Sequence, residues 1–289
     1  MKTEYILQYI VFGNQRFFDE ARFSILSAFH FLNKEPSNCK IVIYTDNEVE
    51  FEDLDVETVN LSKNEWDSWA GEDNYVYRGK ILCIKKCIDK YGLPIIFLDT
   101  DTYFKKHPKF LFERLLAGNN IMHFNEGIPN RDLLNYLNLP KIRNWLLVNG
   151  IKFPTGNNWN SGVIGIKQES TYLMNKILEF NDIYYKVSKY FATEQFAFSV
   201  ILENTKLEAT NDIVYHYWHE SLKTSFIIQY ERMCIDLKNA DSNKWSKVYD
   251  QYLPFMPFKT RISLKSKIVL YRIGLYKKFR CLIPFFFKN

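Results

Sequence analysis

The sequence predicts an α/β fold in which helices cover a largely parallel sheet. The apolar run Pro94–Leu98 lacks alternation of polar and apolar residues and is typical of a strand buried on both faces. Glu4–Phe12 and Lys40–Asp46 are two further apolar strand candidates. Between them, apolar residues recur with the 3.6-residue period of a helix. Strand, helix and strand in this order open a Rossmann-like sheet.

The remaining elements follow in chain order. We expect strands at Val56–Leu61, Ile121–Phe124 and directly after Gly162, and helices within Tyr75–Tyr91, Pro108–Leu116, Gln168–Lys189 and Thr193–Leu202. Thr193 would cap the last helix, with Glu194 in its first turn. Glu126–Asn158 is of mixed character and is interpreted as an insertion flanking the site. No GxGxxG motif is present, so no dinucleotide cofactor is expected.

Charge is distributed unevenly along the 289 residues. From Gln251 onward there are nine lysines and arginines and no acidic residue, which leaves 29 basic against 33 acidic residues before it. The net charge of +5 is therefore a property of the tail, and no nucleic-acid partner is expected. We predict a catalytic domain over residues 1–255 and a basic tail over 256–289.

The tail has the pattern of an amphipathic helix. Leu264, Ile268, Tyr271, Leu275, Phe279 and Leu282 recur at helical spacing among basic residues. This pattern predicts a helix lying on an anionic membrane surface. A basic helix packed on the domain, or a disordered end, is the alternative.

Other features favour the cytoplasm. Cys83 and Cys87, four residues apart, are interpreted as core thiols in a reducing compartment. The amino terminus has no signal-peptide pattern, and no run approaches the ~20 apolar residues of a membrane span. Together with the tail, this predicts a cytoplasmic protein peripherally associated with the inner face of the membrane.

Asp99-Thr100-Asp101 follows the buried strand directly. In extended backbone, residues i and i+2 project to the same side, so the two carboxylates can converge. They repel each other unless a cation lies between them. Mg²⁺ or Mn²⁺ prefers oxygen ligands and leaves positions open for substrate phosphates. In the alternative interpretation, one aspartate caps the next turn and the other is solvated.

Basic and polar residues suggest contacts to a nucleotide. Arg78 and Lys80 begin a helix, where positive charge opposes the macrodipole at a cost of ~0.3–1 kcal/mol unless an anion binds there. Asp46 ends a predicted strand, where a nucleoside can bind, and Asn160 offers a donor and an acceptor to sugar hydroxyls. Surface charge and simple turns are the alternatives.

Histidines near the end of the predicted domain are candidate metal ligands. His216, expected to follow a short strand, is a candidate third ligand beside the two aspartates, and His219 competes with it. Lys223, about one turn beyond, could meet a phosphate. Core histidines among aromatic residues are the alternative.

The order of these motifs resembles the GT-A nucleotide-sugar glycosyltransferases, in particular bacterial enzymes similar to glycosyltransferase family 8. The resemblance covers roughly residues 4–225 and rests on Arg78-Gly79-Lys80, Phe97-Leu98-Asp99-Thr100-Asp101, Asn160-Ser161-Gly162, Glu194-Gln195 and His216. The family's glycine and Lys-Pro-Trp after the histidine are absent, and Glu194 stands where the family has aspartate.

The resemblance implies a GT-A fold and a role for each motif. Asp99, Asp101 and His216 would hold Mn²⁺ (or Mg²⁺) on the diphosphate of a UDP-sugar. Arg78 and Lys80 would match donor-binding positions, Asn160 the sugar contact, and Glu194 the acidic residue near the reacting carbon.

The expected reaction is metal-dependent transfer of a hexose from UDP-sugar to a cell-surface glycan: lipopolysaccharide, capsule or a related polysaccharide, as an oligosaccharide or lipid-linked acceptor. If the configuration is retained, Glu194 or Gln195 would steady an oxocarbenium-like transition state. If it is inverted, a carboxylate must act as base. Two alternatives are a haloacid-dehalogenase-type phosphatase with Asp99 as nucleophile and a non-catalytic, membrane-recruited glycan-binding module.

Overall fold

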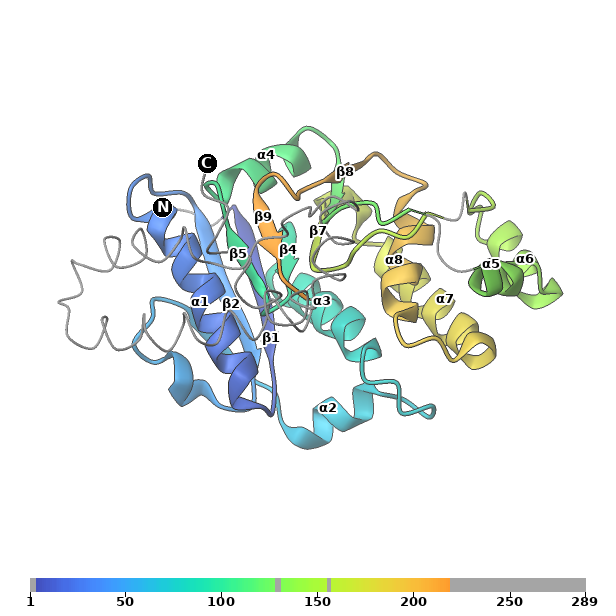
Figure 1. The fold of residues 1–289 in the computed structure, drawn as a ribbon, viewed down its shortest axis with the longest axis horizontal. Coiled ribbons are helices and arrows are strands. Elements are labelled where there is room, and N and C mark those ends of the chain that lie inside the picture. The colour runs from blue at the N-terminus through green and yellow to red at the C-terminus, as the bar shows by residue number, and fades with distance from the viewer. Residues whose placement is uncertain (1–3, 128–130, 155–156, 219–289) are drawn as a thin grey trace, which may run out of the picture.

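A seven-stranded sheet forms the centre of the protein. The computed structural model describes residues 4–127, 131–154 and 157–218 (Figure 1). The strands lie in the order β3-β2-β1-β4-β7-β6-β8, and β7 runs antiparallel to both its neighbours while every other pairing is parallel. Their bounds are β1 Tyr5–Val11, β2 Cys39–Thr45, β3 Glu57–Asn60, β4 Ile95–Leu98, β6 Asn120–Met122, β7 Val163–Ile166 and β8 Leu207–Ala209.

A second, two-stranded sheet continues from the central one. β5 (Thr102–Phe104) begins four residues after β4 ends and pairs antiparallel with β9 (Val214–His216). The helix α1 (Gln15–Leu32) packs against β5. The small sheet therefore ties a segment from late in the chain to the carboxyl edge of the central sheet.

Helices cover both faces of the central sheet. α1 and α4 pack on one face, and α3, α7 and α8 on the other, with α5 and α6 beyond α7 at one end of the molecule (Figure 1). Besides α1, the α-helices are α2 Lys63–Trp69, α3 Arg78–Tyr91, α4 Lys109–Leu116, α5 Arg131–Leu137, α6 Pro140–Val148, α7 Leu173–Ser188 and α8 Thr193–Leu202; Glu48–Phe51 and Gln168–Ser170 are 3₁₀ helices.

The pleat of β1 shows why the strands are apolar throughout. Leu7 and Tyr9 face the α1 side of the sheet, whereas Ile6 faces α3, and all three are fully buried. Burying such a side chain contributes ~1.5–3 kcal/mol. With helices on both faces, each position of the strand must be apolar or hydrogen-bonded, which produces the uniform runs in the sequence.

The predicted α/β fold is confirmed, and the predicted strands and helices are present within a few residues of their expected bounds. Cys83 and Cys87 are buried free thiols, as expected. Glu126–Asn158 contributes α5 and α6 to the main body, consistent with an insertion. None of the helices in the described ranges is long and apolar enough to cross a membrane. The predicted tail at 256–289 and its boundary lie outside the described residues.

Four local expectations are wrong. Ala192, not Thr193, occupies the N-cap of α8, and the Thr193 hydroxyl donates to the Tyr190 carbonyl instead. The long helix starts at Leu173, after a 3₁₀ turn. His216 is the last residue of a strand rather than a residue after one. The segment from Asp99 to Asp101 is a turn and not extended backbone.

Candidate metal centre

The antiparallel strand β7 explains why two distant segments meet. Leu98, the last residue of β4, lies opposite Val163, the first residue of β7. The residues that follow β4 therefore lie beside those that precede β7, and the Asp99 N–H donates to the Gly162 carbonyl at 2.9 Å.

The small sheet brings in the third segment. After the turn, Thr102 pairs with His216 in the β5–β9 ladder. The Tyr217 N–H donates to the Asp101 carbonyl at 3.0 Å, and the Thr102 hydroxyl donates to the Asp99 carbonyl at 2.8 Å. These contacts place the imidazole of His216 directly against the turn that carries both aspartates.

The turn is also anchored to α1. The Thr100 hydroxyl donates to Glu20 Oε2 at 3.1 Å, and Arg16 Nε binds the other oxygen of that carboxylate at 2.9 Å. Glu20 is fully buried. A buried carboxylate is costly unless it is paired and hydrogen-bonded, so this contact holds the turn in one conformation.

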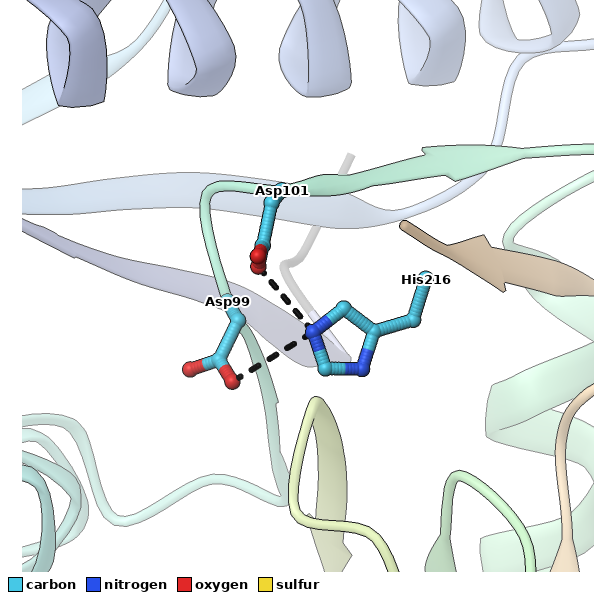
Figure 2. A group of neighbouring side chains, drawn as sticks. All are labelled: Asp99, Asp101 and His216. Atoms are coloured by element: carbon cyan, nitrogen blue, oxygen red, sulfur yellow. Dashed lines mark hydrogen bonds and ion pairs between the residues drawn. The ribbon is translucent and has the colours of Figure 1, made fainter. Parts of the chain in front are cut away.

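Asp99, Asp101 and His216 converge on one point (Figure 2). His216 Nε2 lies 3.0 Å from Asp101 Oδ1 and 3.9 Å from Asp99 Oδ2. One ligand atom from each residue lies within 4.8 Å of the other two. Asp101 and His216 are buried, and Asp99 keeps about a quarter of its side chain exposed. Two carboxylate oxygens and an imidazole nitrogen suit Mn²⁺ or Mg²⁺, with Asp99 on the open side.

Lys80 stands between two acidic groups at this centre. Its Nζ lies 2.9 Å from Asp99 Oδ1 and 3.2 Å from Glu194 Oε1. Burial disfavours the ammonium, but the two carboxylates outweigh burial and raise the pKa of Lys80 above its ordinary value. Burial, reinforced by Asp99, raises the pKa of Glu194. Lys80 therefore remains a cation and offsets part of the negative charge.

The sequence did not single out Glu126, which belongs to the same centre. Its carboxylate accepts from three side-chain amides, those of Asn158 at 3.1 Å, Asn160 at 2.9 Å and Gln195 at 2.9 Å. Gln195 Oε1 in turn accepts from the Ser161 N–H at 3.3 Å. The only available sequence signal was its position, just after the predicted strand Ile121–Phe124.

Two aromatic rings lie against the imidazole of His216. The ring of His123 meets it edge-on, with 5.5 Å between the ring centroids, and the centroid of the Trp218 ring lies 5.0 Å from that of His216. Burial, with His216 nearby, holds the pKa of His123 well below its ordinary value, so His123 is neutral.

Two predicted donor contacts have other partners. The guanidinium of Arg78 binds both carboxylate oxygens of Asp182, at 2.8 and 3.0 Å, and the Trp69 carbonyl at 3.0 Å. It joins α3 to α7. The carboxylate of Asp46 accepts from the Gly13 N–H at 3.2 Å and joins the carboxyl ends of β1 and β2. Arg78 and Asp46 therefore have structural partners inside the protein, and their predicted contacts to the donor stay predictions.

Of the three remaining candidate site residues, the structure describes Asn160 alone. Asn160 is buried beside His216, with its amide bonded inside the protein. His219 and Lys223 lie outside the described residues, and their predicted roles stay predictions.

Comparison with known proteins reveals similarity of fold alone. No family model and no curated protein matches the chain. The structure is similar to mouse xyloside xylosyltransferase 1 in its apo form, with 13% identity and a TM-score of 0.48 over 72% of this chain and 85% of that one. It is also similar to the Saccharomyces cerevisiae mannosyltransferase Ktr4p, with 10% identity and a TM-score of 0.48 over 74% of this chain and 70% of that one. A third similar structure is Aspergillus fumigatus core-mannan synthase A in its Mn/GDP form, with 11% identity and a TM-score of 0.45 over 74% of this chain and 75% of that one. These neighbours are glycosyltransferases, but at such scores the chemistry of this chain must be inferred from its own residues.

Proposed function

We propose that this chain is a metal-dependent glycosyltransferase of the GT-A type, which moves a hexose from a UDP-sugar to a cell-surface glycan. The observation that carries the proposal is the convergence of Asp99, Asp101 and His216 at the carboxyl edge of a largely parallel sheet. Ligands of open α/β sheets bind at this edge. A hard cation with open positions next to a lysine suits a diphosphate.

Four side chains would neutralise the charge of the diphosphate, three through a metal ion and one directly. Asp99, Asp101 and His216 would hold Mn²⁺ or Mg²⁺, which supplies Lewis-acid neutralisation of the charge that develops on the departing diphosphate. Lys80, kept protonated by Asp99 and Glu194, adds a second positive charge on the same side.

The catalytic side chains of the proposal are Glu194 and Gln195, in the first turn of α8. Glu194 is almost fully buried and paired with Lys80, so it also fixes the position of that ammonium. Gln195 spans from Glu126 to the Ser161 N–H, which places its amide at the rim of the centre. If the configuration is retained, these contacts suit stabilisation of a positively charged sugar ring in the transition state. If it is inverted, a carboxylate must take the proton from the acceptor hydroxyl.

The direct test measures nucleotide release. We expect purified protein with Mn²⁺ to release UDP from one UDP-sugar of a panel that also contains GDP-sugars, faster when a glycan acceptor is added. Chelation should stop the release, and Mn²⁺ should restore it. Full activity in excess chelator contradicts the metal role. Phosphate release from phosphomonoesters would favour the phosphatase, and UDP-sugar binding without turnover the glycan-binding module.

The membrane role of the tail is the second half of the proposal. It rests on the basic, amphipathic sequence of residues 256–289. Binding to the membrane surface would also hold the enzyme beside a lipid-linked acceptor. Removing residues 259–289 should release the protein from anionic liposomes and leave hydrolysis of UDP-sugar in solution unchanged. Equal sedimentation of the two forms with such liposomes would refute membrane association.

A further inference from the structure

The side-chain amide of Asn160 has one permitted orientation. One end accepts from the Gly162 N–H at 3.0 Å, and the other donates to Glu126 Oε1 at 2.9 Å. A backbone N–H can only donate, and an ionised carboxylate can only accept. The oxygen of the amide must therefore face Gly162, and the nitrogen must face Glu126.

This orientation determines the tautomer of His216. Asn160 Oδ1 also lies 2.8 Å from His216 Nδ1, so Nδ1 must carry a hydrogen and donate it. In the neutral ring, Nε2 then has a lone pair, which points at Asp101 Oδ1 at 3.0 Å and toward Asp99 Oδ2 at 3.9 Å. A lone pair that faces carboxylate oxygens is repelled unless a metal ion or a second ring hydrogen lies between them.

We propose that Glu126 is a positioning residue of the metal centre. Through the amide of Asn160 it holds His216 as the Nδ1–H tautomer, which keeps Nε2 available as a ligand. The inference rests on the metal site of the proposed function and goes beyond it. It also adds a role to the one expected for Asn160, because both ends of its amide bind within the protein, to Glu126, Gly162 and His216.

Glu126 is suited to this task although it is exposed. Its Oε2 accepts from Asn158 and Gln195, and its Oε1 accepts from Asn160. Three amide donors hold the carboxylate in one place. Metal-bound histidines are commonly oriented in this way by hydrogen bonds of their second nitrogen, and loss of such a partner typically costs ~10–100-fold in metal affinity.

A reciprocal exchange tests whether the hydrogen bond between Glu126 and Asn160 itself supports the metal centre. In Glu126→Gln the new amide nitrogen can face the Asn160 nitrogen, which loses one hydrogen bond. It can instead face the Asn158 and Gln195 donors, which loses two. In Asn160→Asp two carboxylates come to lie 2.9 Å apart. In the double variant the glutamine donates to the aspartate and still accepts at its oxygen, while the aspartate still accepts from His216 and Gly162. All the hydrogen bonds, and the total charge, are preserved.

Electron paramagnetic resonance with Mn²⁺ as the probe reads the centre without substrate. Titration gives the affinity, and pulsed spectra of the bound ion report the ¹⁴N coupling of a coordinated imidazole. We expect Glu126→Gln to weaken Mn²⁺ binding ~10-fold and Asn160→Ala ~10–100-fold, each with reduced ¹⁴N coupling. The double variant Glu126→Gln/Asn160→Asp should bind within ~3-fold of the unaltered protein and recover the coupling.

Glu208→Gln is the matched control. Glu208 accepts from the amide of Asn119 at 2.8 Å on the edge strand β8, so its exchange perturbs a similar amide–carboxylate pair and should leave Mn²⁺ binding unchanged. Unchanged affinity and ¹⁴N coupling in both Glu126→Gln and Asn160→Ala would overturn the positioning role. A double variant that binds Mn²⁺ as weakly as Glu126→Gln would also overturn it. If Asn160→Ala does not fold, the comparison of the double variant with Glu126→Gln decides the question. Absence of Mn²⁺ binding by the unaltered protein would overturn the metal site itself.

Discussion

Two clusters of charged residues differ in how deeply their carboxylates are buried. Near α4 and β8, Arg114 binds Glu208 at 2.8 Å and Asp212 at 2.9 Å, and Lys106 binds Asp212 at 3.1 Å. Two cations therefore meet two carboxylates. We call this the Arg114 cluster.

At the metal centre the acidic groups are more deeply buried. Asp99 and Glu194 share the ammonium of Lys80, and Asp101 Oδ1 lies 3.0 Å from His216 Nε2. Asp101 and Glu194 are more than nine-tenths buried, whereas the carboxylates of the Arg114 cluster keep more than two-fifths of their side chains exposed. The comparison teaches that charged residues by themselves do not mark a functional site, whereas buried carboxylates that converge with an imidazole form a ligand set for a cation.

The largest expected effect comes from the carboxylates of the centre. Asp99→Asn and Asp101→Asn should each lower the rate of UDP release by at least ~10²–10³, because the diphosphate loses its counter-charge. Thermal unfolding in chelator should change little, since these carboxylates serve the cation rather than the core. Retained Mn²⁺-dependent turnover in Asp101→Asn would remove the distinction between the two clusters.

A glycine next to β7 provides a second, steric test. A Cβ on Gly162 would lie 2.1 Å from His216 Nδ1, so Gly162→Ala must push the imidazole away from Asn160 and Asp101. We expect a loss of ~1–3 kcal/mol in the free energy of unfolding and at least ~10-fold weaker Mn²⁺ binding.

Gly165→Ala is its control. There the Cβ would lie 2.3 Å from a side-chain carbon of Ile121, within the core. Denaturant unfolding should show a comparable loss of stability, but Mn²⁺ affinity should stay as in the unaltered protein. If both variants lose the metal equally, the loss follows from destabilisation and not from displacement of His216.

The smallest expected effect concerns the Arg114 cluster. Burial raises the pKa of Asp212, but hydrogen bonds from Lys106 and Arg114 outweigh it and hold that pKa below the ordinary value of 3.8. The ion pairs therefore add stability above pH ~3.8 and lose it as the pH falls through the lower folded value. Asp212→Asn should cost ~0.2–1 kcal/mol at pH 7.

The difference in unfolding free energy between Asp212→Asn and the unaltered protein should shrink below pH ~4, because both then lack the charge. Mn²⁺ binding at pH 7 should be identical in the two. Weakened Mn²⁺ binding would mean that this cluster also supports the metal centre.

Much of the fold could be predicted from local pattern. The uniformly apolar runs that became β1, β2 and β4, and the 3.6-residue period of α1, identified an α/β protein with a covered sheet. The direction of β7 could not be predicted in the same way, because the run Val163–Ile166 reads alike in parallel and antiparallel pairings. Its direction decides that Gly162 lies beside Asp99.

The site too could be predicted only in part. Asp99, Asp101 and His216 were expected together, and the structure brings them together, although through a turn and a strand pairing rather than through an extended segment. Arg78 and Asp46 carry the expected residue types at the expected ends of their elements, yet their hydrogen bonds go to Asp182 and Gly13.

The sequence by itself determined which residues can form strands and helices and which chemical groups follow the strands, because periodicity and residue type are local properties of the chain. Only the tertiary structure decided how those groups pair. Glu126, Asn160 and His216 are joined through side-chain contacts that span 34 and 56 positions of sequence. Such contacts depend on strand direction and loop geometry, and these are set by the packing of the whole sheet rather than by any one segment.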